Sequence, residues 1–499
     1  MPPSPIIVWF RQDLRLSDQR ALSAAVATQR PLLPVYILDD QAAGAWKLGA
    51  ASRWWLHQSL NSLSNDLAVL GAPLILRRGN TGSQLAQLAA QSGATSVYCS
   101  HCYEPWAAKL ETDLKRSLAS SNAELKRFSG VLLKDPGTVC TKAGDPFKVY
   151  TPYWRAMNAQ GAPPQPLPRP DAIKAVKSKI ASDALASWGL EPAGPDWAPG
   201  LRAAWHPGES GANANLARFL DEGLTGYADM RNRPDKTGTS RLSAHLHFGE
   251  ISPHQCWHAA AATAARNGDS SGKDLQTFHK ELVWREFSYN LLSHWPNLPE
   301  TPFRKEFAAF PWQEDTANLK AWQRGRTGYP IVDAGMRELW HTGWMHNRVR
   351  MVAASFLIKH LLIPWQQGEA WFWDTLVDAD LASNAASWQW VAGSGADAAP
   401  YFRIFNPVTQ GETFDPDGGY VRRWVPEIAA LPNSHLQAPW TAPASILSAA
   451  GVTLGQTYPH PIVDHGLARL RALAGYESVK SANTPADRQD LGRRFPATK

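Results

Sequence analysis

The sequence predicts two folded parts: an α/β domain with a Rossmann-like, doubly wound parallel sheet, and an all-helical domain joined to it by a long linker. Between residues 6 and 130, short β-branched runs alternate with amphipathic segments, the pattern of repeated strand–helix–strand units. From about residue 208 onward, nearly every segment has helical periodicity. The text between them, such as GAPPQPLPRP, is rich in proline, alanine and glycine, which is typical of a surface connection. We therefore expect the α/β domain over 1–133, the linker over 134–207, the helical domain over 208–476 and a polar, disordered tail over 477–499.

Five strands are expected in the α/β domain, at IIVWF, LLPVYILD, PLILRR, TSVYCS and ELKRFS, with helices such as SRWWLHQSLNSLSNDLAVLG between them. Asp18 and Ser52 are expected to cap helix N-termini, and Gly71 and Gly93 to end helices. Because strand ends in such sheets open onto ligand crevices, this domain is expected to carry a small molecule. No G-x-G-x-x-G follows the first strand, which argues against an ordinary dinucleotide site there.

Composition indicates a folded protein of the cytoplasm. The 499 residues are 44% hydrophobic and 19% charged, and no apolar run reaches the roughly 20 residues that span a bilayer. The N-terminus lacks the pattern of a secretory signal, so we expect no membrane contact. The four cysteines form no disulfide framework, and chance explains the CxxC of Cys99 and Cys102 better than a metal site. A net charge of +6 permits a polyanionic partner without requiring one.

The stretch from Trp344 to Asn406 concentrates the residues best suited to a functional site. Asn347 and Met351 are four residues apart and share one face of a predicted helix, while Arg348 and Arg350 can point elsewhere. Short acids, an amide and indoles follow: Asp378, Asp380, Asn384, Trp388 and Trp390. A cap or core role is the simpler interpretation for any one of them, but the cluster as a whole favours function.

Two further blocks accompany this stretch. TGTSRLS (237–243) offers hydroxyls, backbone N–H groups and a cation at the expected start of a helix, which suits phosphate oxygens and equally suits a plain N-cap. ELVWREF (281–287) places Glu281 and Trp284 three residues apart, so that a carboxyl lies beside an indole. Basic residues gather nearby, at Arg231, Arg233, Lys236 and Arg241.

These motifs resemble the photolyase and cryptochrome family over almost the whole chain, from VWFRQDLRLSD to about Pro461. GASRWWLHQSL and DADLASNAASWQW are more similar to the bacterial class III photolyases, which are related to plant cryptochromes, than to class I. The resemblance implies an N-terminal antenna domain and a helical domain that holds a U-shaped FAD beneath a DNA-facing cavity. The implied activity is that of a carbon–carbon lyase: light-driven repair of cyclobutane pyrimidine dimers in damaged DNA, by electron transfer from excited reduced FAD to the flipped-out lesion. A monomer without an obligate protein partner is expected.

The resemblance also implies roles for single residues. Those that would surround FAD are Tyr227, Thr239, Ser240, Arg241, Leu242, Ser243, Arg285, Arg350, Asp378, Asp380 and Asn384. If the Asn384 amide faces flavin N5, its oxygen can accept the N–H of the reduced ring, and unlike an aspartate it does not titrate near neutral pH. It would thereby favour the fully reduced flavin. No metal is implied.

For the lesion, the resemblance makes Trp284 and Trp390 the walls of the pocket, completed by Asn347 and Met351. Burial is expected to raise the pKa of Glu281, so that a protonated carboxyl donates to a thymine carbonyl as negative charge arrives there. Phosphates would be gripped by Arg348, Arg403 and the Arg233-to-Arg241 region.

Tryptophan is concentrated near this site, with 11 of the 23 between residues 284 and 390. Trp388, Trp365 and Trp312 match the family's chain of indoles, which passes electrons from the surface to photoexcited flavin.

Three other functions remain open. A (6-4) photolyase would carry histidines where this chain has Asn347 and Met351, and His346 lies one residue away. A cryptochrome-like blue-light photoreceptor would be expected to have a long C-terminal extension and, in plants, an Asp in place of Asn384. A flavoprotein that only transfers electrons would not need the basic runs or the Trp284 and Trp390 pair.

The antenna chromophore is also open. Similarity to class III suggests methenyltetrahydrofolate, but the folate-holding residues of class I are not matched, since Glu104, Pro105 and Trp106 occupy part of that stretch. An 8-hydroxy-5-deazaflavin is the alternative.

Overall fold

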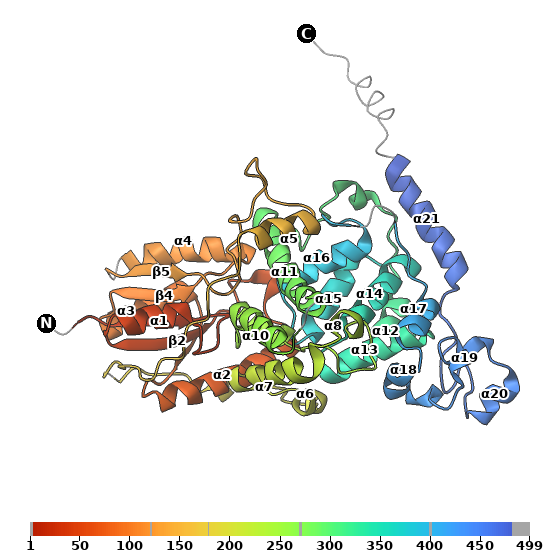
Figure 1. Cartoon of the computed structure of the whole chain (residues 1–499), viewed down its shortest axis with the longest axis horizontal. Coiled ribbons are helices and arrows are strands. Elements are labelled where there is room, and N and C mark those ends of the chain that lie inside the picture. The colour runs from red at the N-terminus through yellow and green to blue at the C-terminus, as the bar shows by residue number, and fades with distance from the viewer. Residues whose placement is uncertain (1–2, 120–121, 178, 269–271, 399–401, 482–499) are drawn as a thin grey trace, which may run out of the picture.

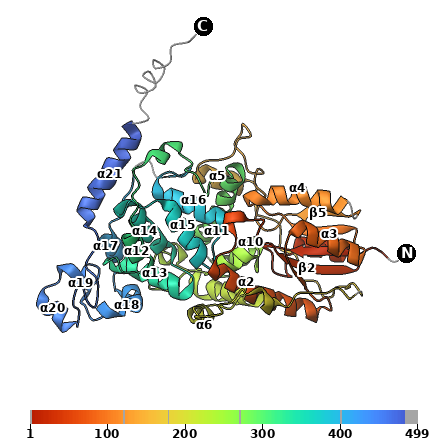
Figure 2. The same ribbon diagram turned by 180° about the vertical axis from the view of Figure 1, so that it is seen from behind.

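The structure is a computed structural model that describes residues 3–119, 122–177, 179–268, 272–398 and 402–481. An α/β part and a helical part lie side by side, with the sheet at one end of the molecule and the C-terminal helix α21 at the other, as Figure 1 and the reverse view in Figure 2 show. Among the described residues, no helix combines the length and apolar character needed to cross a membrane.

The α/β part contains one five-stranded sheet of order β3-β2-β1-β4-β5, and every neighbouring pair is parallel. Its strands are β1 (Ile6–Phe10), β2 (Leu32–Leu38), β3 (Ile75–Arg78), β4 (Ser96–Ser100) and β5 (Glu124–Phe128). Its helices are α1 (Arg20–Ala27), α2 (Ala50–Val69), α3 (Thr81–Ser92) and α4 (Pro105–Ala119). Ile6 and Val8 pack with α1 and α2, whereas Ile7 and Trp9 pack with α3 and α4. Since successive side chains of a strand point to opposite faces, helices cover both faces, and the predicted doubly wound sheet is confirmed.

Helices dominate the rest of the chain. Those of the linker and the first half of the helical part are α5 (Tyr150–Ala159), α6 (Pro199–Ala204), α7 (Glu209–Arg218), α8 (Tyr227–Met230), α9 (Ser243–Phe248), α10 (Pro253–Arg266) and α11 (Lys273–His294). The following ones are α12 (Thr316–Gln323), α13 (Pro330–Thr342), α14 (Asn347–Ser355), α15 (Trp365–Thr375), α16 (Leu381–Ala392), α17 (Pro407–Phe414), α18 (Gly419–Trp424), α19 (Asn433–Leu436), α20 (Ala444–Ala449) and α21 (His465–Ser481). Two π-helical turns, η3 (Phe219–Gly223) and η5 (Phe356–His360), continue α7 and α14.

Short 3-10 turns complete the structure: η1 (Gly44–Trp46), η2 (Leu185–Trp188), η4 (Lys305–Ala309), η6 (Pro426–Ile428) and η7 (Pro439–Thr441). The linker thus contains helices of its own, while the boundaries at 133 and 207 stay predictions. Helix α21 ends at Ser481, so residues 477–481 are helical where disorder was expected. The remainder of the expected tail, 482–499, lies outside the described residues.

Two of the predicted helix caps are wrong. Gln19, not Asp18, caps α1, and the Asp18 carboxylate instead accepts the backbone N–H of Leu167 in the linker at 2.9 Å. Ser52 lies inside α2, and its hydroxyl donates to the backbone oxygen of Leu376 at 3.3 Å. Both side chains therefore join the α/β part to later segments, which a local cap rule cannot anticipate.

The two glycine predictions fare better. Gly93 ends α3 in the left-handed conformation, with φ of 70°. Gly71 follows Leu70, the C-cap of α2, and is also left-handed, with φ of 80°.

A buried hydrogen-bond network fixes α9 against the α/β part. Trp55 of α2 donates from Nε1 to Glu250 Oε1 at 2.9 Å, and His245 of α9 bonds the other oxygen of Glu250. The second ring nitrogen of His245 lies 3.0 Å from the Asn215 amide of α7. Because His245 and Glu250 are fully buried, each polar group needs its partner, and the network holds the start of α9 in one place.

Candidate functional site

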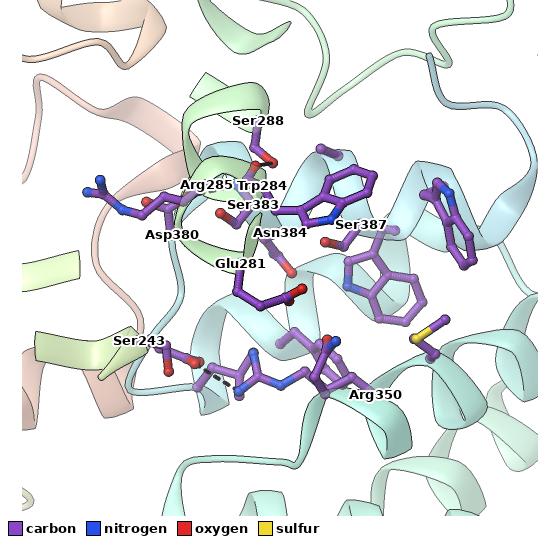
Figure 3. A pocket seen from close by; sticks show the side chains of 18 of the residues that line it. Ser243, Glu281, Trp284, Arg285, Ser288, Arg350, Asp380, Ser383, Asn384 and Ser387 are labelled. Carbon is purple, nitrogen blue, oxygen red and sulfur yellow. Dashed lines mark hydrogen bonds and ion pairs between the residues drawn. The ribbon is translucent and has the colours of Figure 1, made fainter. Parts of the chain in front are cut away.

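A cavity of about 570 Å³ opens inside the helical part, lined by residues of α8, α9, α11, α14 and α16 and of the loops between them. Every residue that the resemblance assigns to FAD lines it: Tyr227, Thr239, Ser240, Arg241, Leu242, Ser243, Arg285, Arg350, Asp378, Asp380 and Asn384. Figure 3 shows Glu281 projecting from α11 and Asn384 from α16 toward this space. Segments as far apart in sequence as 227 and 384 therefore meet at one site.

The TSRLS segment forms one wall of the cavity and leads into α9, as the sequence predicts. Arg241 has φ of 53°, an uncommon left-handed conformation for a residue with a side chain. Its guanidinium lies 4.3 Å from the ring centre of Trp205 and 5.1 Å from that of Trp344. Its Nε has no hydrogen-bond partner among the described residues. A half-buried cation with unused donor capacity suits an anionic ligand group, such as a phosphate.

Arg350 and Asp378 pair across the cavity wall, with Nη2 of the arginine 2.8 Å from Oδ2 of the aspartate. Arg350 also donates from Nε to the backbone oxygen of Met345 at 2.7 Å. The other carboxylate oxygen of Asp378, Oδ1, is buried without a hydrogen-bond partner in the part of the chain that the structure describes. The wall therefore offers both a fixed cation and a free acceptor to a polar ligand.

Asp380 sets the start of α16 by accepting the backbone N–H of Ser383 at 2.7 Å. Burial alone would raise its pKa, but the nearby His247, whose Nδ1 lies 3.8 Å from Oδ2, the charge of Arg285 and a hydrogen bond from Tyr289 hold the pKa well below its usual value. Asp380 is therefore an anion that fixes the helix on which Asn384 lies one turn later.

The Asn384 amide is oriented by its own hydrogen bond. Its Nδ2 donates to the backbone oxygen of Glu369 at 3.2 Å. Because the amide nitrogen is used in this way, the carbonyl oxygen is the group left for the cavity. The predicted acceptor position of Asn384 is thus supported by the network around it.

The residues expected at the lesion line the same cavity: Glu281, Trp284, Asn347, Arg348, Met351 and Trp390. Glu281 lies on α11, with Oε2 at 2.7 Å from Nη2 of Arg231. Burial raises the pKa of Glu281, and the charges of Arg231 and Arg348 oppose this effect without cancelling it. The raised pKa that was expected from the sequence is confirmed in direction, while the ion pair with Arg231 was not foreseen.

His346 has a structural role that its position beside Asn347 did not reveal. It caps α14, and its Nδ1 accepts the backbone N–H of Arg348 at 3.2 Å. Burial lowers its pKa to about 4, so the ring is neutral at physiological pH. This histidine therefore stabilises the N-terminus of the helix on which Asn347 and Met351 lie.

Arg403 lies apart from the residues that line the cavity. It is exposed in the segment before α17, and its guanidinium covers the Phe405 ring at 4.8 Å. Its contact with a phosphate stays a prediction. Arg233, by contrast, lies 2.8 Å from Asp235 and 2.9 Å from Asp417, so two carboxylates already compete for it.

Trp388 is the only member of the predicted indole chain among the described residues that line this cavity. Its ring centre lies 5.0 Å from that of Phe372 and 6.3 Å from that of Trp322. It also packs so closely on Gly368 that a Cβ there would lie 2.1 Å from its Cη2. Gly368 is one turn after Trp365, which is buried at the start of α15. This packing supports a path from Trp388 toward Trp365.

Trp312 is half-buried in the segment before α12 and contacts Phe310, with ring centres 4.4 Å apart. The next residue, Gln313, donates its backbone N–H to the oxygen of Leu362 at 2.8 Å. The Trp312 segment therefore runs beside the segment that leads into Trp365. Among the described residues, no direct ring contact joins these three indoles, so the electron chain stays a prediction.

Several lining residues were missed from the sequence. Arg231, Trp344 and Asp397 line the cavity, as do Ser288, Ser383 and Ser387. Arg231 was visible as part of a basic run, but only the packing of α8 against α11 shows that its partner is Glu281. For the CxxC pair, Cys99 and Cys102 are free thiols, and no group of three or more metal-ligating side chains was found among the described residues.

Known proteins share this arrangement. Residues 6–171 match the DNA photolyase domain, and residues 278–478 match the FAD binding domain of DNA photolyase. A deoxyribodipyrimidine photo-lyase of Agrobacterium fabrum is 51% identical over 477 residues, which cover 96% of this chain and 98% of that protein. This chain belongs to the photolyase and cryptochrome family.

Both branches of the photolyase and cryptochrome family are similar to it. The crystal structure of a bacterial class III photolyase from Agrobacterium tumefaciens has a TM-score of 0.93 and 50% identity, covering 96% of this chain and 98% of that one. Cryptochrome-1 of Arabidopsis thaliana is 38% identical and covers 96% of this chain but 72% of that protein. Of these relatives, the two Agrobacterium photolyases have the higher identity and the fuller coverage.

Proposed function

We propose that this chain repairs cyclobutane pyrimidine dimers in DNA by light-driven electron transfer. The observation that carries the proposal is one cavity lined both by the residues expected around FAD and by those expected around the lesion, with Glu281 between them. The similar bacterial proteins named deoxyribodipyrimidine photo-lyase or class III photolyase support it.

The residues of the cavity fit FAD. Arg241, with its unused Nε, and the hydroxyls of Thr239, Ser240 and Ser243 would take the phosphate groups. Arg350 and Asp378 would take polar edges of the cofactor, and Asn384 would present its Oδ1 as an acceptor that does not titrate near neutral pH. FAD in its reduced form supplies the electron that splits the dimer after absorbing blue light.

The lesion would stack between the indoles of Trp284 and Trp390. Flipping a dimer out of the duplex costs a few kcal/mol, less than for intact bases because the lesion already weakens stacking. Aromatic walls recover about 1 to 3 kcal/mol per stacked base. Glu281, with its raised pKa, would donate a hydrogen bond to a thymine carbonyl as that carbonyl gains negative charge.

The antenna domain is proposed to bind methenyltetrahydrofolate, with 8-hydroxy-5-deazaflavin as the alternative. A third option comes from an archaeal photolyase of Sulfolobus tokodaii, described with two FAD molecules and 26% identical to this chain at a TM-score of 0.79. Extraction of the chromophores and their masses will distinguish the three.

A reducing cytoplasm and a monomeric state complete the proposal. All four cysteines are free, including the half-buried Cys102 and Cys140, which fits a compartment that keeps thiols reduced. Light scattering on the purified protein, with and without damaged DNA, measures the oligomeric state.

The deciding experiment uses two oligonucleotides, one with a cyclobutane dimer and one with a (6-4) photoproduct. With chemically reduced protein and blue light, we expect intact thymines from the dimer and none from the (6-4) product. Repair of the (6-4) product alone would assign the other repair activity. Binding of FAD without repair of either lesion would favour a cryptochrome-like photoreceptor.

A further inference from the structure

Behind the lesion wall lies an aromatic ring from the linker. Helix α5 packs against α11, as both overall views show, and its first residue, Tyr150, stacks on Trp284. The two ring centres are 3.6 Å apart and the ring planes differ by 5°. Tyr150 is buried and does not line the cavity, whereas Trp284 is half-buried and does. One face of the indole is therefore covered from behind, which leaves the other for a base.

Phe287 closes this aromatic group from the side. Its ring meets that of Trp284 edge-on, at 5.9 Å and 78°, and meets that of Tyr150 in the same manner, at 5.9 Å and 76°. A parallel neighbour and an edge-on neighbour together oppose rotation of the indole about its side-chain bonds. The orientation of Trp284 is thus set before any ligand arrives.

The hydroxyl of Tyr150 contacts the same helix next to the second lesion residue. It donates to the backbone oxygen of Lys280 at 2.7 Å, one residue before Glu281. Tyr150 therefore touches α11 at two points, by its ring at Trp284 and by its hydroxyl at the turn that carries Glu281.

The opposite side of the cavity approaches the start of α5. Asp397 lines the cavity in the loop that follows α16, the helix of Trp390. Burial raises the pKa of Asp397, and the backbone N–H of Tyr150 opposes this rise, so the carboxyl lies near the first turn of α5.

We propose that Tyr150 is a positioning residue for lesion recognition, which holds the Trp284 indole in the orientation that stacks on the dimer. This inference rests on the proposed function, because it takes Trp284 as a wall of the lesion pocket. An indole that is already oriented loses little rotational freedom when the dimer binds, so more of the stacking free energy contributes to the affinity for the dimer.

The test measures dissociation constants for a dimer-bearing strand and for the same strand without damage, in wild type and variants. Tyr150→Leu should weaken dimer binding about tenfold, with FAD content and binding of undamaged DNA unchanged. Tyr150→Phe keeps the stacked ring and should stay within about twofold of wild type. The repair yield per photon at saturating dimer should be the same in all three, because only the population of correctly stacked complex changes.

Tyr153 supplies the matched control. It lies on the same helix, is equally buried and contacts Phe287 with ring centres 5.4 Å apart, but makes no ring contact with Trp284 among the described pairs. Tyr153→Leu should lower the thermal midpoint and leave dimer affinity within about twofold. Equal losses of affinity in the two Leu variants would reduce Tyr150 to a core residue and overturn the proposal.

A second variant covers the case in which Tyr150→Leu does not fold. Tyr150→Met fills the core with a longer, flexible side chain but has no ring to stack on the indole, and it should weaken dimer binding by about threefold or more while undamaged DNA binds as before. An unchanged dimer affinity in a folded Tyr150→Met or Tyr150→Leu protein would refute the proposal. Repair by the wild type is scored in the same assay, so a failure of the proposed function is seen separately.

Discussion

At the scale of single residues, Glu281 is held between two opposing effects. Burial raises its pKa, while Arg231 at 2.7 Å favours the charged carboxylate. A phosphate that draws Arg231 away, or a base that excludes water from the pocket, would move the balance further toward the protonated form. The carboxyl is thus poised to become a hydrogen-bond donor when the lesion enters.

This balance predicts a pH dependence of repair. Since a raised pKa extends the protonated form to higher pH, the yield per photon should be greatest below the pKa of Glu281 and fall as the pH rises through it. Glu281→Gln keeps a donor that does not titrate, so its yield should be flat over the same range. Glu281→Ala should lower the yield at least about twofold, with dimer affinity largely kept. A wild-type profile as flat as that of Glu281→Gln would contradict the donor role.

The role of Trp388 in electron transfer to FAD can be tested by substitution. Because phenylalanine is far harder to oxidise than indole, Trp388→Phe should abolish photoreduction of protein with oxidised FAD. Repair by protein that was chemically reduced beforehand should survive, since the electron is then already in place. The smaller ring should cost the core at most a few kcal/mol.

Trp322→Phe is the control for this prediction. Trp322 is fully buried and its ring contacts that of Trp388 at 6.3 Å, but it is not a member of the predicted chain. The Trp322→Phe protein with oxidised FAD should photoreduce normally. Normal photoreduction by Trp388→Phe, or loss of repair in its pre-reduced and folded form, would remove Trp388 from the chain.

At the scale of secondary structure, α11 explains why one helix carries so much of the site. Glu281, Trp284, Arg285 and Ser288 line the cavity, whereas Glu286 points to the linker, where its carboxylate accepts the backbone N–H of Lys134 at 3.1 Å. The helix therefore faces the cavity on one side and packs against other parts of the protein on the others. A helix of this kind shows no simple division into apolar and polar sides.

Glu286 makes the stability of this helix contact depend on pH. Burial raises its pKa from 4.5 to about 7, and its Oε1 has no hydrogen-bond partner among the described residues. Between these two pH values the folded state keeps a proton that the unfolded state has lost. The free energy of unfolding therefore falls as the pH rises from about 4.5 to about 7, and it levels off above that. From pH 5 to 8 the loss should be roughly 2 to 3 kcal/mol. The Glu286→Gln protein should not lose this stability, so the difference between its thermal midpoint and that of the wild type should increase as the pH rises. If the thermal midpoints of the two proteins change with pH in parallel, Glu286 stays neutral or is solvated.

The sequence predicted those elements whose signal is local. Buried parallel strands are continuous apolar runs, so IIVWF and SVYCS were found at β1 and β4 within a residue of their ends. Asp18 and Ser52 were misassigned because their partners, Leu167 and Leu376, are far away in sequence.

In the site, the same limit applies. The motifs that line the cavity could be named from their residue types, but the Arg231 and Glu281 pair depends on how α8 packs on α11. Tyr150 belongs to a linker that looked like a connection and not like part of a site. Contacts between side chains of different helices leave no periodic pattern in the sequence, so only the folded structure shows them.

At the scale of the whole molecule, a net charge of +6 is modest, and part of the positive charge is neutralised in ion pairs. Arg233 bonds two aspartates, and Arg337 pairs with Glu427 at 2.8 Å. Arg348 differs, since it lines the cavity, donates to the neutral Asn232 side chain at 2.6 Å and stacks over Phe414 at 4.4 Å. Its charge is therefore available to a phosphate beside the flipped lesion.

Binding of damaged DNA should consequently weaken as salt rises, because each phosphate contact releases counterions. Arg348→Ala should reduce the slope of log affinity against log salt by about one unit, and Arg348→Lys, which keeps the charge, should restore it. Arg116→Ala is the control: this arginine of α4 has 78% of its side chain exposed, pairs with Asp113 and lies in the α/β part. Its loss changes the net charge equally but removes no contact at the cavity, so the slope should not move. If both alanine variants shift the slope alike, the salt dependence reflects overall charge, and Arg348 makes no specific phosphate contact.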